Sequence, residues 1–547
     1  MISDFGQKRT KHWVAPLFLF LLALALRIYK AGPECYYNGD ALILPSLVSF
    51  SKNPAWVFFH SYGIITPIIS EVFTNILVFS GITINEFWWI FPFGVAGTSA
   101  IAIIYFLIRE IAGYKAAVFV TVVMALNPAD IILCRYSYGY ECVSFFLAIL
   151  SLYLFILYLR NPVKLYGILL SIALSCYILS HVFFIIILAV FLWAANIFYP
   201  RKSEGAPFTR ELKNIFSRKE FIFPLISVLF LLFQFAFYMS ALKIFKYDLA
   251  NSAQLISFGR EVCADFRHQF QTPLAHYLLR AGSLGRDFFA QARDEFFKYY
   301  GFWPLVTLCI IPFGVKDALK FNKRSIFFLW GIIYIIPYYL IDLFNVSRPV
   351  VYFNFGFTPF LIYFSLLLYD SIVYINKKYK ENNLLKILYS GLILCIFIFL
   401  TLPEFNFLRI KEDSGVKAMG YYMRNYVKEG FFIYSASSYL NDPMFCYYFG
   451  RGVSRGNFLS SEELIKKDFE NNLNNVEVII TEAKKKDYFD SFSGFEIKAR
   501  VFKISGKNEQ DLMLLYARRQ INLPFKDMNV EEYNKLFDNI LTGIIKK

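Results

Sequence analysis

Residues 33–45 read PECYYNGDALILP, and the rest of the chain is organised around this short stretch. It follows the first long apolar run, residues 13–29, and contains the carboxylate of Asp40. The basic residues before that run (Lys8, Arg9 and Lys11) favour an N-terminus in the cytoplasm. No small-residue cleavage site follows, so we interpret the run as a retained membrane helix rather than a signal peptide. Asp40 is therefore expected in a loop at the outer surface of the membrane.

The composition is typical of a protein that crosses a membrane many times. Of 547 residues, 57% are hydrophobic and only 18% are charged, whereas soluble domains carry about 25% charged residues. A mean hydropathy of +0.46 over this length indicates many spans rather than one buried core. The net charge of +15 comes from Lys and Arg beside apolar runs, where they set topology and meet anionic lipids. Membrane lipids are therefore expected partners, and nucleic acid is not.

Apolar runs of membrane-spanning length recur throughout the first 402 residues. Because roughly 20 apolar residues cross a hydrocarbon core, these runs predict a mainly α-helical polytopic membrane protein with about 11 to 13 spans. After residues 13–29, the runs are residues 87–108, 116–134, 142–159, 165–180, 182–199, 221–245, 296–315, 325–344, 350–370 and 384–402.

Residues 62–84 are also apolar, but they contain Glu71 and have no basic flank. If this segment does not cross the membrane, the basic loops between later runs all fall on the side of the basic N-terminus, which is the cytoplasm by the positive-inside rule. If it does cross, they all fall outside, so we predict that residues 62–84 lie along the outer surface. The predicted outer loops are then residues 32–86, 127–141, the junction at His181, 246–295 and 345–349.

The last part of the chain has a different character. In residues 403–547 the charges increase, and helical and strand patterns alternate, which predicts a small extracytoplasmic α/β domain after a transmembrane domain at residues 1–402. The expected helices are residues 415–429 and 461–471, and the expected strands are residues 431–435, 476–481, 495–504 and 512–517.

Two acidic residues on the outer side could carry chemistry. Asp40 stands in a Gly-Asp pair before an apolar run, so it is either a helix N-cap or a functional carboxylate at the membrane surface. Glu141 stands at the start of the apolar run at residues 142–159. It is either an interfacial residue or a second carboxylate that acts with Asp40. Asp130 is the alternative second carboxylate. Two such carboxylates divide base and orienting roles or hold a divalent metal. No other cofactor is indicated.

Cations on the same side form a candidate site for a lipid phosphate. His181 interrupts an apolar stretch, which marks either a functional residue or a hydrogen bond between helices. The guanidinium of Arg348 could bind phosphate oxygens in a forked manner, and Tyr352 follows it by one turn. The aromatic-rich, basic loop at residues 246–295 predicts either a headgroup-bound helix or a lipid-phosphate contact. The candidate donor-binding residues are Arg135, His181, Arg267, Arg348 and Tyr352.

These motifs together resemble the membrane glycosyltransferases of the C fold, in particular the protein-mannosyltransferase and aminoarabinose-transferase group. The similarity lies in YYNGDALI (36–43), HSYGIITPIISEVF (60–73), residues 126–160, YILSHVFFIII (177–187) and SRPVVYFNFGFTPF (347–360), and the C-terminal YYFGR and LLYAR also fit. Members usually have Asp-Glu in the first loop, but Ala41 follows Asp40 here. A second carboxylate would therefore be Glu141 or Glu34.

The resemblance implies a polyprenyl-phosphate sugar as donor, with a glycan, lipid or protein as acceptor. Asp40 would be the general base of an inverting transfer, and His181, Arg348 or an Arg of residues 246–295 would stabilise the leaving lipid phosphate. Two alternatives remain: a transporter or flippase of lipid-linked saccharides, and a receptor-like membrane protein whose tail binds a partner. No internal repeat of the transporter kind is evident.

Overall fold

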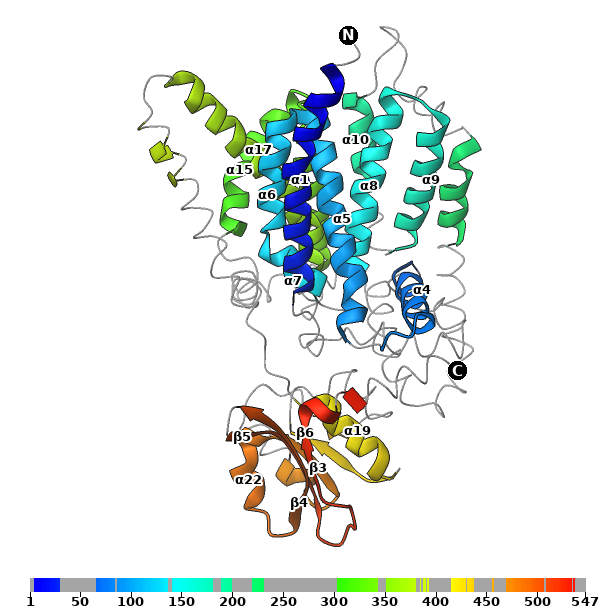
Figure 1. Cartoon of the computed structure of the whole chain (residues 1–547), viewed down its shortest axis with the longest axis vertical. Coiled ribbons are helices and arrows are strands. Elements are labelled where there is room, and N and C mark those ends of the chain that lie inside the picture. Colours follow the sequence, from blue (N-terminus) through cyan, green and yellow to red (C-terminus); the bar gives the residue numbers. More distant parts are fainter. Residues whose placement is uncertain are drawn as a thin grey trace.

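Most of the described helices gather into one bundle, and a six-stranded sheet lies beyond one end of it in this computed structural model (Figure 1). Helix α1 (Asp4–Ile28) begins at the opposite end and runs toward the sheet. The structure describes residues 4–29, 65–83, 86–135, 140–180, 188–198, 219–230, 303–342, 351–379, 384, 387–389, 391–392, 415–428, 430–436, 455–456, 469–505, 508–533 and 535–536.

The bundle consists of apolar helices, which confirms the predicted multi-pass membrane protein. Within the described ranges, three stretches are long and apolar enough to cross a membrane, namely Phe91–Ala112, Cys142–Arg160 and Phe357–Lys378. After α1, the helical elements are α4 (Ile65–Phe79), α5 (Glu86–Ala112), α6 (Tyr114–Ala125), α7 (Pro128–Arg135), α8 (Tyr140–Arg160), α9 (Lys164–Ile178), α10 (Leu188–Phe198), η4 (Lys219–Phe221), α15 (Trp303–Leu319), α16 (Ser325–Asp342) and α17 (Val351–Lys378).

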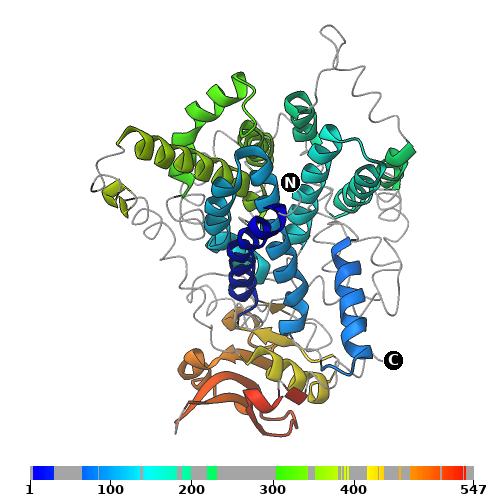
Figure 2. The same cartoon turned by 45° about the horizontal axis from the view of Figure 1, so that its top comes forward.

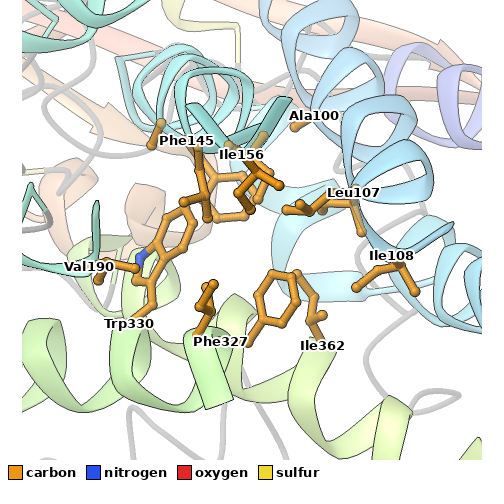
Figure 3. Close-up of a cluster of buried hydrophobic side chains, with 14 of the residues drawn as sticks. Ala100, Leu107, Ile108, Phe145, Ile156, Val190, Phe327, Trp330 and Ile362 are labelled. Carbon is orange, nitrogen blue, oxygen red and sulfur yellow. The ribbon is translucent and has the colours of Figure 1, made fainter. Parts of the chain in front are cut away.

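Interlocking side chains from most of the described bundle helices form the interior of the bundle. Figure 3 shows this cluster, to which α5, α8, α10, α16 and α17 all contribute. The ring of Phe145 on α8 lies 5.7 Å from the indole of Trp330 on α16, and Phe155 lies 5.4 Å from Phe191 on α10, measured between ring centroids. Packing of this kind is the main attraction between helices surrounded by lipid, because lipid tails are as apolar as the side chains.

The apolar run at residues 116–134, expected as one span, is two helices. Helix α6 ends at Ala125, and α7 begins at Pro128. Proline has no N–H to donate and disfavours helical geometry at the residue before it, so the chain turns at Asn127. Helix α7 then lies at the end of the bundle that faces the sheet (Figure 1), which we call the sheet end.

Ion pairs mark the other end of the bundle, which we call the basic end. Arg160, the last residue of α8, donates to Glu110 near the end of α5 at 2.6 Å. In the turn between α15 and α16, Arg324 pairs with Asp317 and with Asp370 of α17. These contacts fix the direction of the helices: α8 and α17 begin at the sheet end and finish at the basic end.

Helix α4 lies between the bundle and the sheet (Figures 1 and 2), and that this segment does not cross the membrane stays a prediction. Leu77 and Val78 near its C-terminus join the core of the C-terminal unit, together with Met419 and Tyr422. Because Trp88 at the start of α5 packs against the same cluster, the C-terminal unit is anchored by two consecutive elements of the chain.

The C-terminal unit is a mixed sheet with short helices, which confirms the predicted α/β architecture. Its strands follow the order β2-β1-β3-β5-β4-β6, with parallel β1–β2, β1–β3 and β4–β6 pairs and antiparallel β3–β5 and β4–β5 pairs. Its elements are α19 (Val416–Tyr426), β1 (Ile433–Ser435), β2 (Arg455–Gly456), β3 (Val478–Glu482), η8 (Ala483–Lys485), α22 (Lys486–Asp490), β4 (Phe495–Ser505), β5 (Asn508–Arg518) and β6 (Lys526–Asn529).

Alternating side chains give this sheet two buried faces. On β3, Val478 and Ile480 point to the cluster shared with α19 and α4, whereas Ile479 packs with Phe469 and Phe489 on the other face. The predicted helix at 415–429 and the four predicted strands are present. The predicted helix at 461–471 and the boundary at 402/403 lie largely or wholly outside the described residues.

Candidate functional site

A buried ion pair holds the C-terminal end of α1 at the sheet end of the bundle. The side chain of Arg27 is fully buried and pairs with Asp130 in the first turn of α7. Arg27 also donates to the carbonyl of Ala23 at 3.0 Å, and to the carbonyls of Met124 and Ala125 at the end of α6, each at 3.4 Å. The pair therefore fastens α1 to the α6–α7 corner just before residues 30–64, which carry Asp40.

Arg135 completes this attachment from the other end of α7. Its guanidinium donates to the carbonyl of Tyr29 at 2.7 Å and to that of Leu26 at 3.4 Å. The last carbonyls of a helix have no partner within the helix, and a cation at this end is also favoured by the helix dipole. Arg135, predicted as a donor-binding residue, therefore has a structural role as a cap on α1, and phosphate binding by it stays a prediction.

Two glycines allow α1 to approach α5 closely at this point. A Cβ added to Gly94 would come within 2.8 Å of the Ile28 side chain. A Cβ added to Gly97 would come within 2.2 Å of Cys134 Sγ and 3.2 Å of Arg27 Nε. Small residues of this kind let membrane helices pack backbone to backbone, and here they make room for α7 beside α1 and α5.

The start of α8 and the end of α9 meet beside this corner. Ser144, one turn after Glu141, donates to the hydroxyl of Ser180 at 2.8 Å, and Ser180 immediately precedes His181. The side chains of Ser144 and Ser180 are both buried. This hydrogen bond brings the backbone next to Glu141 and the backbone next to His181 to the same place at the sheet end.

The predicted first outer loop is anchored at this place on both of its sides. Its N-terminal anchor is Tyr29, whose carbonyl is held by Arg135. Its C-terminal anchor is Ile65, whose N–H donates to the carbonyl of Leu179 at 3.4 Å. Residues 30–64 therefore leave the bundle beside the helix that leads to Glu141 and return beside the residues that lead to His181.

The start of α17 also reaches this end. Asp370 on α17 pairs with Arg324 at the basic end, and Tyr352 is the second residue of the same helix. At 1.5 Å per residue, the two positions lie about 27 Å apart along the helix axis, so the backbone of Tyr352 lies at the sheet end. Helix α17 contacts both α7 and α8, which brings its start toward the same corner.

The C-terminal unit packs against α4, which lies next to this corner. Tyr422 of α19 lies in the apolar cluster that includes Leu77, and its hydroxyl donates to the carbonyl of Pro524 at 2.7 Å. Burial raises the pKa of Tyr422 to about 12, with a smaller contribution from Tyr426. The contact is therefore mainly apolar, and it links the sheet to α4, the helix that follows residues 30–64.

The described residues place part of the predicted site. The backbones of Glu141, Arg135 and Tyr352 lie at the sheet end, although the side chains of Glu141 and Tyr352 are outside the described part of the structure. The predicted residues that lie wholly outside it are Asp40, His181, Arg267 and Arg348, together with the alternative carboxylate Glu34.

A metal site is not visible among the described side chains, where no group of three or more His, Cys, Asp or Glu could hold an ion. The predicted divalent metal would depend on Asp40 and Glu141, so it stays a prediction. Asp130, the rival second carboxylate, is instead occupied by Arg27. Arg27 was missed from sequence, although a charged residue near the end of an apolar run signals a buried partner.

The overall fold is that of solved oligosaccharyltransferase structures. The apo crystal structure of the Archaeoglobus fulgidus oligosaccharyltransferase matches with a TM-score of 0.51 and 14% identity, covering 95% of this chain and 76% of that one. The archaeal oligosaccharyltransferase AglB from A. fulgidus, in complex with an inhibitory peptide and a dolichol-phosphate, matches with a TM-score of 0.50 and 12% identity, with the same coverage.

A third structure, ArnT from Cupriavidus metallidurans bound to undecaprenyl phosphate, has a TM-score of 0.48 and 10% identity over 94% of this chain and 98% of that one. No protein-family model matches the sequence, and a search of the curated proteins finds no similar sequence. At these identities the oligosaccharyltransferase likeness concerns the fold, and it confirms the predicted C-fold architecture.

Proposed function

We propose that this protein is an inverting glycosyltransferase that moves a sugar from a polyprenyl-phosphate-linked donor to an acceptor on the outer face of the membrane. The observation that carries the proposal is the convergence at the sheet end of the bundle. There, the loop with Asp40 is anchored at both ends, beside the segments that lead to Glu141 and His181. The C fold supports the same reaction class, since one matching protein was solved with a dolichol-phosphate.

The proposed reaction needs a base and a site for a leaving phosphate. A hydroxyl or amine of the acceptor attacks the anomeric carbon from the face opposite the phosphate, and Asp40 accepts the proton as the new bond forms. The configuration at that carbon inverts, and the lipid phosphate leaves with its negative charge. We assign the stabilisation of that charge to His181 and Arg348, with Arg267 as a further candidate.

Glu141 is proposed as the second carboxylate of the site. It stands in the first turn of α8, where the positive end of the helix dipole favours a negative charge. Its role would be to orient the acceptor or, together with Asp40, to hold a divalent metal. The proposal extends to topology: the sheet end faces outward, and the N-terminus is cytoplasmic.

The direct test is turnover by the full-length protein. Purified protein is incubated in lipid with polyprenyl-phosphate sugars and an extract of envelope glycans, lipids and proteins, and the release of free polyprenyl phosphate is measured. Transfer of the sugar to an acceptor, with stoichiometric release of the lipid phosphate, is the expected result. If the donor stays intact and only moves from one leaflet to the other in proteoliposomes, the protein is a flippase and the proposed glycosyltransferase activity is refuted.

Topology is tested separately by labelling. A cysteine introduced at Ser437 in the C-terminal unit should react in intact cells or spheroplasts with a reagent that does not cross membranes. Reaction only after permeabilisation would reverse the proposed orientation.

A further inference from the structure

Two cysteine side chains face each other at the corner that holds the first outer loop. Cys134 near the end of α7 and Cys142 near the start of α8 are both thiols in this structure, and their Sγ atoms lie 3.2 Å apart. Both side chains are buried, at 0% and 4% exposure. Since a disulfide joins its sulfur atoms at about 2.05 Å, a shift of roughly an ångström would bring them to bonding distance.

A positive charge lies beside one of these sulfur atoms. The Cβ position of Gly97 is close to both Cys134 Sγ and Arg27 Nε, so these two atoms converge on the same spot. Arg27 Nε is buried and has no hydrogen-bond acceptor among the described residues. Cys134 therefore lies beside a buried guanidinium at the corner where α1, α5 and α7 meet.

We propose that Cys134 and Cys142 form a disulfide that links α7 to α8. One cysteine, as thiolate, attacks an external disulfide of an oxidoreductase or small molecule and releases one thiol. The second cysteine then attacks the resulting mixed disulfide and releases the other thiol. Two S–H bonds break and one S–S bond forms, and the two electrons and two protons end on the oxidant, which is reduced to two thiols.

The compartment for this reaction is the outer side of the membrane, where disulfides persist, so the inference rests on the topology given under the proposed function. The bond would close residues 135–141 into a short loop. That loop begins with Arg135, which caps α1, and ends with Glu141. Helix α7 holds the end of α1 through the pair between Asp130 and Arg27. A disulfide from α7 to α8 would therefore also fix α8 to the point where residues 30–64, which carry Asp40, leave the bundle.

Trypsin makes the test direct, because Arg135 lies between the two cysteines. Cells that make the full-length protein are quenched with an alkylating reagent, and the denatured protein is digested without reduction and analysed by mass spectrometry. The expected product is peptide 116–135 joined to peptide 136–160, with the two released separately only after reduction. Two separate peptides, each carrying an alkyl group before reduction, would overturn the inference.

Variants and internal controls exclude accidental pairing. Cys176 on α9 and Cys309 on α15 should be found alkylated or in other peptides, never joined to 116–135. In the variant Cys142→Ser, the thiol of Cys134 should become alkylated without reduction; if peptide 116–135 stays blocked there, the pairing is wrong. The disulfide mapping does not depend on whether the protein transfers sugar. A linked pair in a protein without transferase activity would refute the proposed function alone, and an active protein with two alkylated thiols would refute this inference alone.

Discussion

The buried pair between Arg27 and Asp130 should dominate the stability of the corner from which residues 30–64 depart. The two side chains are 0% and 9% exposed. Asp130→Asn keeps the shape of the side chain but removes its charge, so the guanidinium of Arg27 is left buried with only carbonyl acceptors. Removing one partner of a buried pair costs about 3–5 kcal/mol, because the remaining charge is uncompensated.

A second ion pair in the same bundle is the matched control. Arg160 and Glu110 are joined at 2.6 Å, but their side chains are 29% and 35% exposed. An exposed pair contributes only about 0–1 kcal/mol, because solvent screens it. Glu110→Gln should therefore lower the free energy of unfolding several times less than Asp130→Asn. Both values are obtained by titrating the full-length protein from mild to denaturing detergent.

The double variant separates a pairwise interaction from general damage. Arg27→Leu with Asp130→Leu removes both charges at once, and apolar replacement of a whole buried pair is often neutral. The double variant should thus be more stable than the sum of the two single changes predicts, with a coupling free energy of about 1–3 kcal/mol. Coupling within about 0.5 kcal/mol of zero would refute the view that this pair holds α1 to α7.

Gly97→Ala should lower the melting temperature, because the added methyl group would lie 2.2 Å from Cys134 Sγ. The control Gly391→Ala, where a Cβ would meet nothing within 4 Å, should leave the melting temperature unchanged. Equal effects of the two variants would contradict this packing. Leu77→Ala should lower the free energy of unfolding by about 2–5 kcal/mol and make the C-terminal unit more susceptible to proteolysis. Ile76→Ala, at a position that is 57% exposed, should have neither effect. Equal protease resistance of the two variants would refute the anchoring of the C-terminal unit by α4. Because the pKa of Tyr422 is raised to about 12, the stability from its protonated form is complete below about pH 10 and lost as the pH rises toward 12. Tyr422→Phe should therefore reduce the loss of thermal stability over that range, and an unchanged pH profile would contradict it.

Charge patterns and periodicity predicted much of the architecture. The prediction for residues 62–84 rests on the basic loops at Arg109, Arg160 and Lys316, which share one side of the membrane only if this segment does not cross. The strands were found because alternating or continuous apolar residues in segments such as 476–481 indicate sheet burial. These signals are local, or they add up over many residues, which makes them readable without a structure.

The corner at the sheet end was not predictable in the same way. Pro128 was visible in the sequence, yet the apolar run around it concealed the break between α6 and α7. The partners Arg27 and Asp130 are 103 positions apart, and nothing local shows which carboxylate meets a given arginine. The same limit applied to Arg135, whose charge predicts phosphate binding and helix capping equally well.

Asp40 is the proposed base of the sugar transfer. Asp40→Asn keeps the size of the side chain, and Asn caps a helix as well as Asp does, but it cannot accept the proton at neutral pH. The measurement is the rate of sugar transfer from a polyprenyl-phosphate donor by the purified variant, after melting has shown that it is folded and donor binding is intact. The rate of the variant should be lower by about 10²–10⁴-fold. A rate within a few-fold of the parent protein would show that Asp40 only caps a helix, and would move the base to Glu141 or Glu34.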